Sequence, residues 1–187
     1  MCSSDLNYDT GWSPSSRVDA GVTMTFGIND FNQVTNQVSS AGTNSFAYDG
    51  NGNRISKSWI NASGGTAQLI YTYDDENQLV SAATDTSATP ALSRWRSDFV
   101  YDGKRRLRKR IDYVWDTGAW GQTAEVRYLY DGMMMMQERD GANAVQVTYT
   151  RGLDLSGTLH AAGGIGGLLG RTAAGVPAYY HADGNGN

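Results

Sequence analysis

Two segments of this sequence have the residue types of ligand-binding loops. The first runs from Asp49 to Asn53 and places oxygen-bearing side chains at alternate positions, as the first half of a calcium loop does. Arg54 stands where that loop needs glycine, and Ile60 stands where it needs a bidentate glutamate. The sequence therefore predicts an Asn- and Gly-rich hairpin turn at this place instead of a calcium site.

The second segment is a glycine cluster, a type of sequence whose backbone amides can cradle a phosphate. It has no GxGxxG spacing and no following Gly-Lys-Ser/Thr, so we expect close backbone packing there and no bound cofactor. His160 and His181 flank the cluster without a cysteine or another histidine nearby, which predicts no metal site. A GxSxG elbow is also missing, and we predict no catalytic residue. The glycines of the cluster are Gly163, Gly164, Gly166, Gly167 and Gly170.

A basic run extends from Lys104 to Arg110. Read as a strand, it places Arg106, Arg108 and Arg110 on one face, and we expect that face to be solvated. The alternative is a contact with a polyanion or an acidic partner.

The composition excludes several classes of function. The chain has 187 residues, a net charge of −4 and a pI near 5.0, which argues against general binding of nucleic acid. No window approaches 18 apolar residues, so no membrane-spanning segment is expected. Cys2 is the only cysteine, which excludes a disulfide framework within the chain.

An internal repeat carries most of the information in the sequence. The pattern aromatic-x-Tyr-Asp occurs four times, with intervals of 25, 28 and 29 residues between its aspartates. Degenerate copies lie at 26–34 and 180–183, and a Tyr-Asp pair stands at positions 8 and 9. The signature residues are Tyr48 and Asp49, Tyr73 and Asp74, Tyr101 and Asp102, and Tyr130 and Asp131.

Each repeat has the features of a β-hairpin. Aromatic residues two positions apart lie on the same face of a strand, and the following aspartate can accept hydrogen bonds from backbone amides two residues on. One such unit is too small to bury its own apolar face, so the units must stack into a continuous sheet. The sequence predicts an all-β fold of antiparallel hairpins that form a curved sheet.

These repeats resemble the YD repeats of the RHS family, large bacterial proteins whose repeats wind into a hollow β-shell. The segment 152–169, with Gly152, Asp154 and the glycine cluster, and the segment 179–187 resemble the RHS core region. The resemblance implies a secreted or cell-surface parent protein whose shell encloses a C-terminal toxin or effector. It implies that the partners of this segment are the rest of its parent chain and that effector. The self-cleavage pattern of the family does not occur before Asn187.

We expect three parts along the chain. Residues 1–6 have the sequence that a sequencing adapter encodes and are expected to be non-native, residues 7–150 to be YD repeats, and residues 151–187 to begin the core segment. The expected function is structural and not enzymatic. The alternative is a surface module that binds carbohydrate through Trp95, Trp115 or Trp120, and an enzyme would need carboxylates clustered with a histidine.

Overall fold

The computed structural model describes residues 5–61, 64–87 and 94–181, and within these ranges it contains strands and turns but no helix. Accordingly, these ranges hold no helix with the length and hydropathy needed to cross a membrane. The predicted all-β fold is therefore confirmed. Cys2 and the last two residues of the repeat copy at 180–183 lie outside the described residues.

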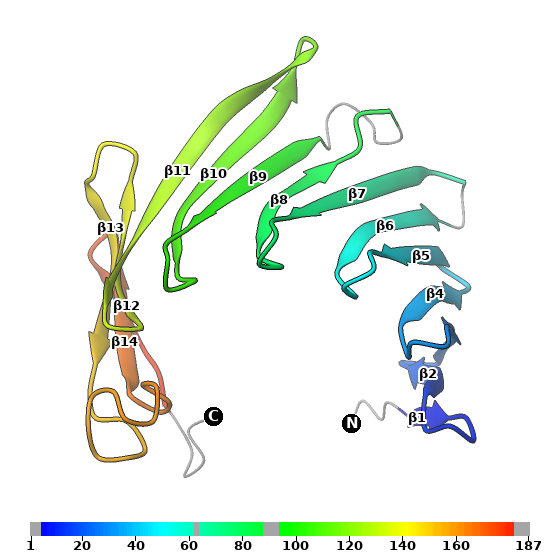
Figure 1. Ribbon diagram of the computed structural model, residues 1–187, viewed down its shortest axis with the longest axis horizontal. Helices are drawn as coiled ribbons and strands as arrows, with labels where there is room; N and C mark the ends of the chain where they lie inside the picture. The colour runs from blue at the N-terminus through cyan, green and yellow to red at the C-terminus, as the bar shows by residue number, and fades with distance from the viewer. Residues whose placement is uncertain (1–4, 62–63, 88–93, 182–187) are drawn as a thin grey trace. The chain divides into compact units, whose positions relative to one another are not determined.

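The chain divides into two units. Unit 1 comprises residues 1–96 and 114–120, and in Figure 1 its strands follow one another along an arc. Its first eight strands are hydrogen-bonded in sequence order, each antiparallel to the next. They are β1 (Asp5–Tyr8), β2 (Pro14–Asp19), β3 (Val22–Ile28), β4 (Val34–Ser39), β5 (Gly42–Tyr48), β6 (Arg54–Asn61), β7 (Thr66–Tyr73) and β8 (Leu79–Thr84).

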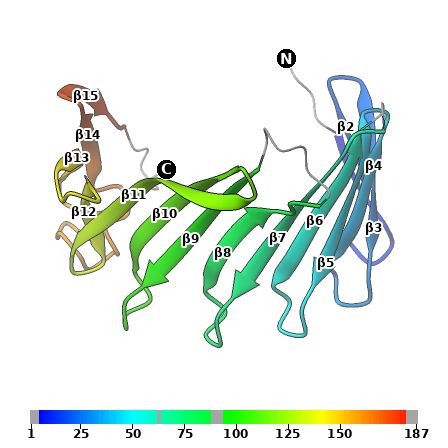
Figure 2. The same ribbon diagram turned by 90° about the horizontal axis from the view of Figure 1, so that it is seen from above.

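Unit 2 comprises residues 97–113 and 121–187. Strands β9 (Trp95–Tyr101), β10 (Leu107–Asp116) and β11 (Ala119–Asp131) have residues in both units. The remaining strands belong to unit 2 and continue the antiparallel order from β11, as Figure 2 shows from above. They are β12 (Met134–Asp140), β13 (Val145–Arg151), β14 (Leu168–Ala173) and β15 (Val176–Tyr179).

Two-residue turns close several of the hairpins. Asp19 pairs with Val22 around Ala20 and Gly21, which have φ angles of 47° and 81°. Positive φ at both central residues matches the right-handed twist of the paired strands, which favours such turns in hairpins. The predicted turn between β10 and β11 has the same form, at Thr117 and Gly118.

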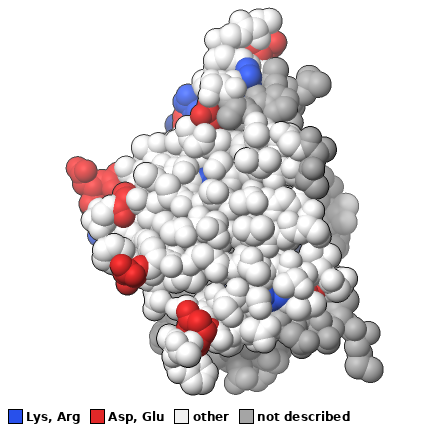
Figure 3. Space-filling model, turned by 90° about the vertical axis from the view of Figure 1, so that its right-hand side faces the viewer, with Lys and Arg blue, Asp and Glu red and all other residues white. Residues whose placement is uncertain are grey.

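The described residues bury little of their apolar surface. The hydrophobic side chains classed as buried are Ala67, Ala82, Tyr128 and Met134. Figure 3 shows a broad face with few charged side chains and with acidic side chains gathered along a margin. Such a sheet leaves many large apolar side chains in contact with water, among them Trp12, Phe31, Ile165, Val176 and Tyr179.

We expect the isolated 187-residue chain to self-associate in solution. Exposed apolar side chains are surfaces on which other chains can add, and so are the outer strands β1 and β15, each of which pairs on one side only within the described residues. Size-exclusion chromatography with light scattering should show a mass above 20.2 kDa that rises with concentration. A monodisperse monomer at every concentration would contradict the expectation.

Candidate functional site

A five-residue turn recurs in this chain and begins at an aspartate or asparagine. In the copy from Asp49 to Asn53, the amide of Asp49 donates to the carbonyl of Asn53 at 2.9 Å, and that of Gly52 donates to the carbonyl of Asp49 at 3.1 Å. Asp49 Oδ1 accepts the amides of Asn51 at 2.9 Å and Asn53 at 2.8 Å. Gly52, the fourth residue, has a φ of 86°. We call these five residues the repeat turn and number its positions one to five.

The same backbone pattern recurs along the chain. In each copy the first residue accepts at least one amide through its side chain, and the fourth residue has a positive φ. Asparagine replaces aspartate at the first position in two copies, because its carbonyl oxygen accepts the same bonds. The repeat turns begin at Asp9, Asn29, Asp49, Asn61, Asp74, Asp102, Asp140 and Asp154.

One signature aspartate departs from this turn. Asp131 ends β11 and pairs with Met134, so only Gly132 and Met133 lie between the paired residues. Its carboxylate is exposed, with Oδ2 lying 3.9 Å from Nε2 of His160. The sequence pattern groups Asp131 with Asp49, Asp74 and Asp102, but the structure gives it a different turn.

The signature tyrosines lie at the ends of the strands that enter these turns. The hydroxyl of Tyr48 donates to the Val34 carbonyl at 2.8 Å, and that of Tyr73 donates to the Arg54 carbonyl at 3.3 Å. In both cases the acceptor is the first residue of the preceding strand. Tyr101 ends β9 and is half-buried, whereas Tyr130 lies beneath the guanidinium of Arg106, 5.2 Å from its ring centre. Burial raises the pKa of both Tyr73 and Tyr130.

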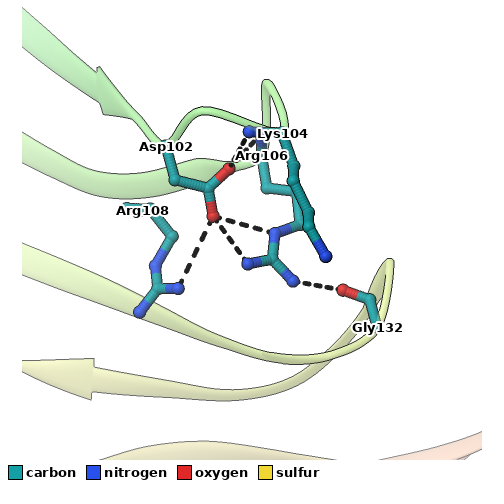
Figure 4. A network of polar contacts seen from close by, with 5 residues as sticks. All are labelled: Asp102, Lys104, Arg106, Arg108 and Gly132. Carbon is teal, nitrogen blue, oxygen red and sulfur yellow. Dashed lines mark hydrogen bonds and ion pairs between the residues drawn. The ribbon is translucent and has the colours of Figure 1, made fainter.

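Asp102 is the centre of a polar network in unit 2 (Figure 4). Its Oδ1 accepts the amides of Lys104 and Arg106, and its Oδ2 accepts Nε of Arg106 at 2.8 Å. The Arg106 guanidinium also donates to the carbonyl of Gly132, and Arg108 lies 3.6 Å from the same carboxylate. The side-chain bond from Arg106, with the two amides, lowers the pKa of Asp102 from 3.8 to about 2.

The prediction for the basic run was therefore wrong in part. Lys104, Arg105 and Arg106 belong to the repeat turn, and β10 begins at Leu107. Arg106 is not on a solvated face, because its side chain is only 15% exposed and is paired with Asp102. Arg108 and Arg110 remain more than 40% exposed, as expected for a solvated face.

We predict that Arg106→Gln raises the pKa of Asp102 from about 2 toward 3.8. A carboxyl with a lowered folded-state pKa stabilises the fold above its ordinary pKa, and this contribution is lost as the pH falls through the folded-state value. The wild-type turn should thus persist at pH 4 and weaken toward pH 2, whereas the variant should weaken at a higher pH. NMR titration of the Asp102 carboxyl measures the shift, and an unchanged pKa would contradict it.

A buried carboxylate organises the glycine cluster. Asp154 is 6% exposed and lies between β13 and β14. Its Oδ1 accepts the amide and hydroxyl of Ser156, and its Oδ2 accepts the amides of Ala162 at 2.7 Å and Gly164 at 3.2 Å. The Ser156 hydroxyl makes the largest contribution to lowering the Asp154 pKa to about 2, and the three amides add to it.

The glycines around Asp154 permit the close packing that the sequence predicted. A Cβ on Gly167 would lie 2.9 Å from the Gly152 carbonyl oxygen, and a Cβ on Gly152 would lie 2.8 Å from the Leu169 side chain. A Cβ on Gly164 would lie 2.9 Å from the Met134 sulfur. Gly163, Gly164 and Gly166 also have φ angles between 68° and 78°, which other residues adopt only with strain.

The carboxylates of the repeat turns are occupied by the chain's own donors. Asp49 illustrates this, because Oδ1 accepts two amides and Oδ2 accepts the Asn53 side chain at 2.9 Å. Within residues 5–61, 64–87 and 94–181, no three His, Cys, Asp or Glu side chains are grouped so that they could hold a metal ion. The repeat turn therefore uses its carboxylate to fix the backbone.

The sequence analysis missed the fifth position of the repeat turn. Its side chain bonds to the first residue of its own turn in the copies from Asn29, Asp49, Asp74 and Asp102. A sequence signal exists, because a polar residue follows the first residue of each of these turns by four positions. These residues are Gln33, Asn53, Gln78 and Arg106.

Comparison with solved structures shows a shared fold. Residues covering 81% of this chain superpose on 9% of a chain in the crystal structure of TcdB2-TccC3-Cdc42, with a TM-score of 0.56 and 14% identity. A chain of TcdB2-TccC3-TEV gives 0.46 and 13% over 81% of this chain and 10% of that one. A porin-like protein from Bacteroides uniformis gives 0.32 and 9%, over 94% of this chain and 86% of that one. The last two scores are too low to carry an argument.

This chain spans about a tenth of the length of the two TcdB2-TccC3 chains. No family model matches the sequence. No curated protein matches it either. The structural likeness thus establishes an all-β fold shared with a segment of a much larger chain.

Proposed function

We propose that this chain is a non-catalytic wall segment of a longer RHS-type protein whose shell encloses a C-terminal effector. The observation that carries the proposal is the repeat turn, which closes many of the antiparallel hairpins with the same hydrogen bonds. A wall needs many similar hairpins that pair side by side. Here the strands of neighbouring hairpins are hydrogen-bonded to one another.

The limited burial of the sheet supports the same role. A free-standing domain of this length would bury a large core, whereas the described residues include only four buried hydrophobic side chains. A shell wall can leave one face to the solvent and the other to its contents. The fold shared with TcdB2-TccC3-Cdc42, which belongs to a Tc toxin complex, supports a toxin-associated shell repeat.

The experiment that tests this proposal begins with the coding DNA on both sides of this segment. We expect further repeat turns in the extended chain and a different, small domain at its C-terminal end. The extended protein, treated with a protease, should protect that domain more than tenfold relative to the domain alone. Equal digestion rates, or an extension without repeats, would contradict the proposal.

The alternative function, carbohydrate binding at a cell surface, draws support from exposed aromatic rings. Trp95 is 39% exposed and Trp12 is 84% exposed. The rings of Trp115 and Trp120 are less available for stacking on a sugar. They pack edge to face, with ring centres 5.1 Å apart, and the guanidinium of Arg94 lies over the Trp115 ring. A glycan array separates the two functions, since specific signals lost in Trp95→Ala or Trp115→Ala would favour binding, whereas their absence favours the wall.

A further inference from the structure

Side chains connect neighbouring repeat turns along the sheet of unit 1. The hydroxyl of Ser13, at position five of its turn, donates to Oδ1 of Asn32 at 2.8 Å. Two turns further, Nδ2 of Asn53 donates to Oδ1 of Asn77 at 2.7 Å, and Nδ2 of Asn51 donates to the same oxygen at 3.0 Å. In both pairs the acceptor is the position-four residue of the next repeat turn at the same end of the strands. The Asn61 turn, which joins β6 to β7, lies at the opposite end.

The intervening pair of turns has the same arrangement without the acceptor. Position four of the Asp49 turn is Gly52, and a Cβ there would lie 3.5 Å from Nε2 of Gln33, the position-five residue of the preceding turn. The side chain of Gln33 thus reaches the place that Asn32 and Asn77 occupy in their own turns. In unit 2, Arg106 makes the corresponding contact with the carbonyl of Gly132 (Figure 4).

In the Asp49 and Asp102 turns the first residue holds this connecting side chain in place. Asp49 Oδ2 accepts Nδ2 of Asn53 at 2.9 Å, and Asp102 Oδ2 accepts Nε of Arg106 at 2.8 Å. One oxygen of the aspartate closes its own turn, and the other directs position five toward the following turn. A side chain fixed in this way loses little further rotamer freedom when it bonds to its neighbour, which makes the second bond more favourable.

We propose that a polar side chain at position five couples its repeat turn to the next turn at the same end of the strands, so that opening of one turn weakens its neighbour. Asparagine at position four has two roles in this coupling. It tolerates the positive φ of the turn, and its Oδ1 accepts the bond from the neighbouring turn. The coupling depends on contacts between turns at one end of the strands, and it is independent of the proposed shell function. A failure of one proposal therefore leaves the other untouched.

Asn77→Gly tests the coupling. Asn77 has a φ of 59°, so glycine keeps the turn conformation while removing the acceptor for Asn51 and Asn53. We expect the amides of residues 51–53, in the Asp49 turn, to exchange with deuterium about 2- to 10-fold faster, the effect of losing ordinary hydrogen bonds. Mass spectrometry of peptides covering residues 46–55 measures this change in the full chain.

Asn143→Gly is the matched control. Asn143 is also at position four of a repeat turn with a positive φ, 69°, but within the described residues its side chain makes no hydrogen bond. The same substitution there should leave the exchange of adjacent turns unchanged. Exchange at residues 51–53 that is equal in Asn77→Gly and wild type would overturn the proposal.

The reciprocal variant guards against a purely local effect. Asn53→Ala removes the donor from the other side, and faster exchange should then be seen at the amides of Glu76 and Gln78, which bond to Asp74. If exchange in Asn53→Ala became faster only within the Asp49 turn, the bond to Asn77 would not stabilise the Asp74 turn, and the coupling would be overturned.

Discussion

Replacing Gly42 with alanine is expected to lower the free energy of unfolding by about 2–4 kcal/mol, through backbone strain and overpacking. Gly42 begins β5 with a φ of 140°, and a Cβ there would lie 2.1 Å from the carbonyl oxygen of Ile60 and 2.9 Å from Cα of Asn61. Both atoms belong to the backbone of β6, which pairs with β5 at this point. No side-chain rotation can relieve the contact, so the two strands must separate.

The measurement is the urea midpoint, followed by circular dichroism at one protein concentration. Two other glycines separate the causes. Gly21 has a φ of 81° with open space around it, so Gly21→Ala reports strain alone and should lower stability by about 1 kcal/mol. Gly50 has neither a positive φ nor a close neighbour, and Gly50→Ala should change stability by less than about 0.5 kcal/mol. Equal midpoints for all three variants would contradict the clash.

The hairpins could be predicted because their cause is local. In Phe46 to Asn53, alternating aromatic residues, an aspartate and a glycine at position four all favour one conformation, and the structure shows it. The repeat also explains why asparagine can stand at the first position. A pattern that acts within five residues needs no knowledge of distant strands.

The contacts between one turn and another could not be predicted from the sequence, because they depend on strand register. Arg106 meets Gly132 across 26 positions, and that distance in sequence says nothing about which residues face each other. Asp131 follows the same aromatic-x-Tyr pattern as Asp49, yet the chain re-enters the sheet at Met134 instead of five residues on. The length of the turn is decided by the pairing of β11 with β12 and not by the signature.

The second large effect is expected at Asp154. Asp154→Ala leaves the amides of Ala162 and Gly164 and the Ser156 amide and hydroxyl without the acceptor that they share, which is a side chain only 6% exposed. We expect the amides of residues 162–164 to exchange at least about tenfold faster, because bonds to a charged acceptor are stronger than neutral ones. Hydrogen exchange read by mass spectrometry on peptides from residues 152–169 measures this loss.

Asp154→Asn distinguishes the contribution of the carboxylate's charge and second oxygen from that of the side chain's shape. The amide has the size of the carboxylate but only one acceptor oxygen, so it can serve either Ser156 or the pair Ala162 and Gly164, and its NH₂ opposes the remaining donors. Its effect should lie between those of wild type and Asp154→Ala. Since the folded-state pKa of Asp154 is about 2, wild type should keep its slow exchange at pH 4 and lose it only toward pH 2. If Asp154→Asn exchanged as slowly as wild type, the loop would depend on the shape of this side chain and not on its two oxygens.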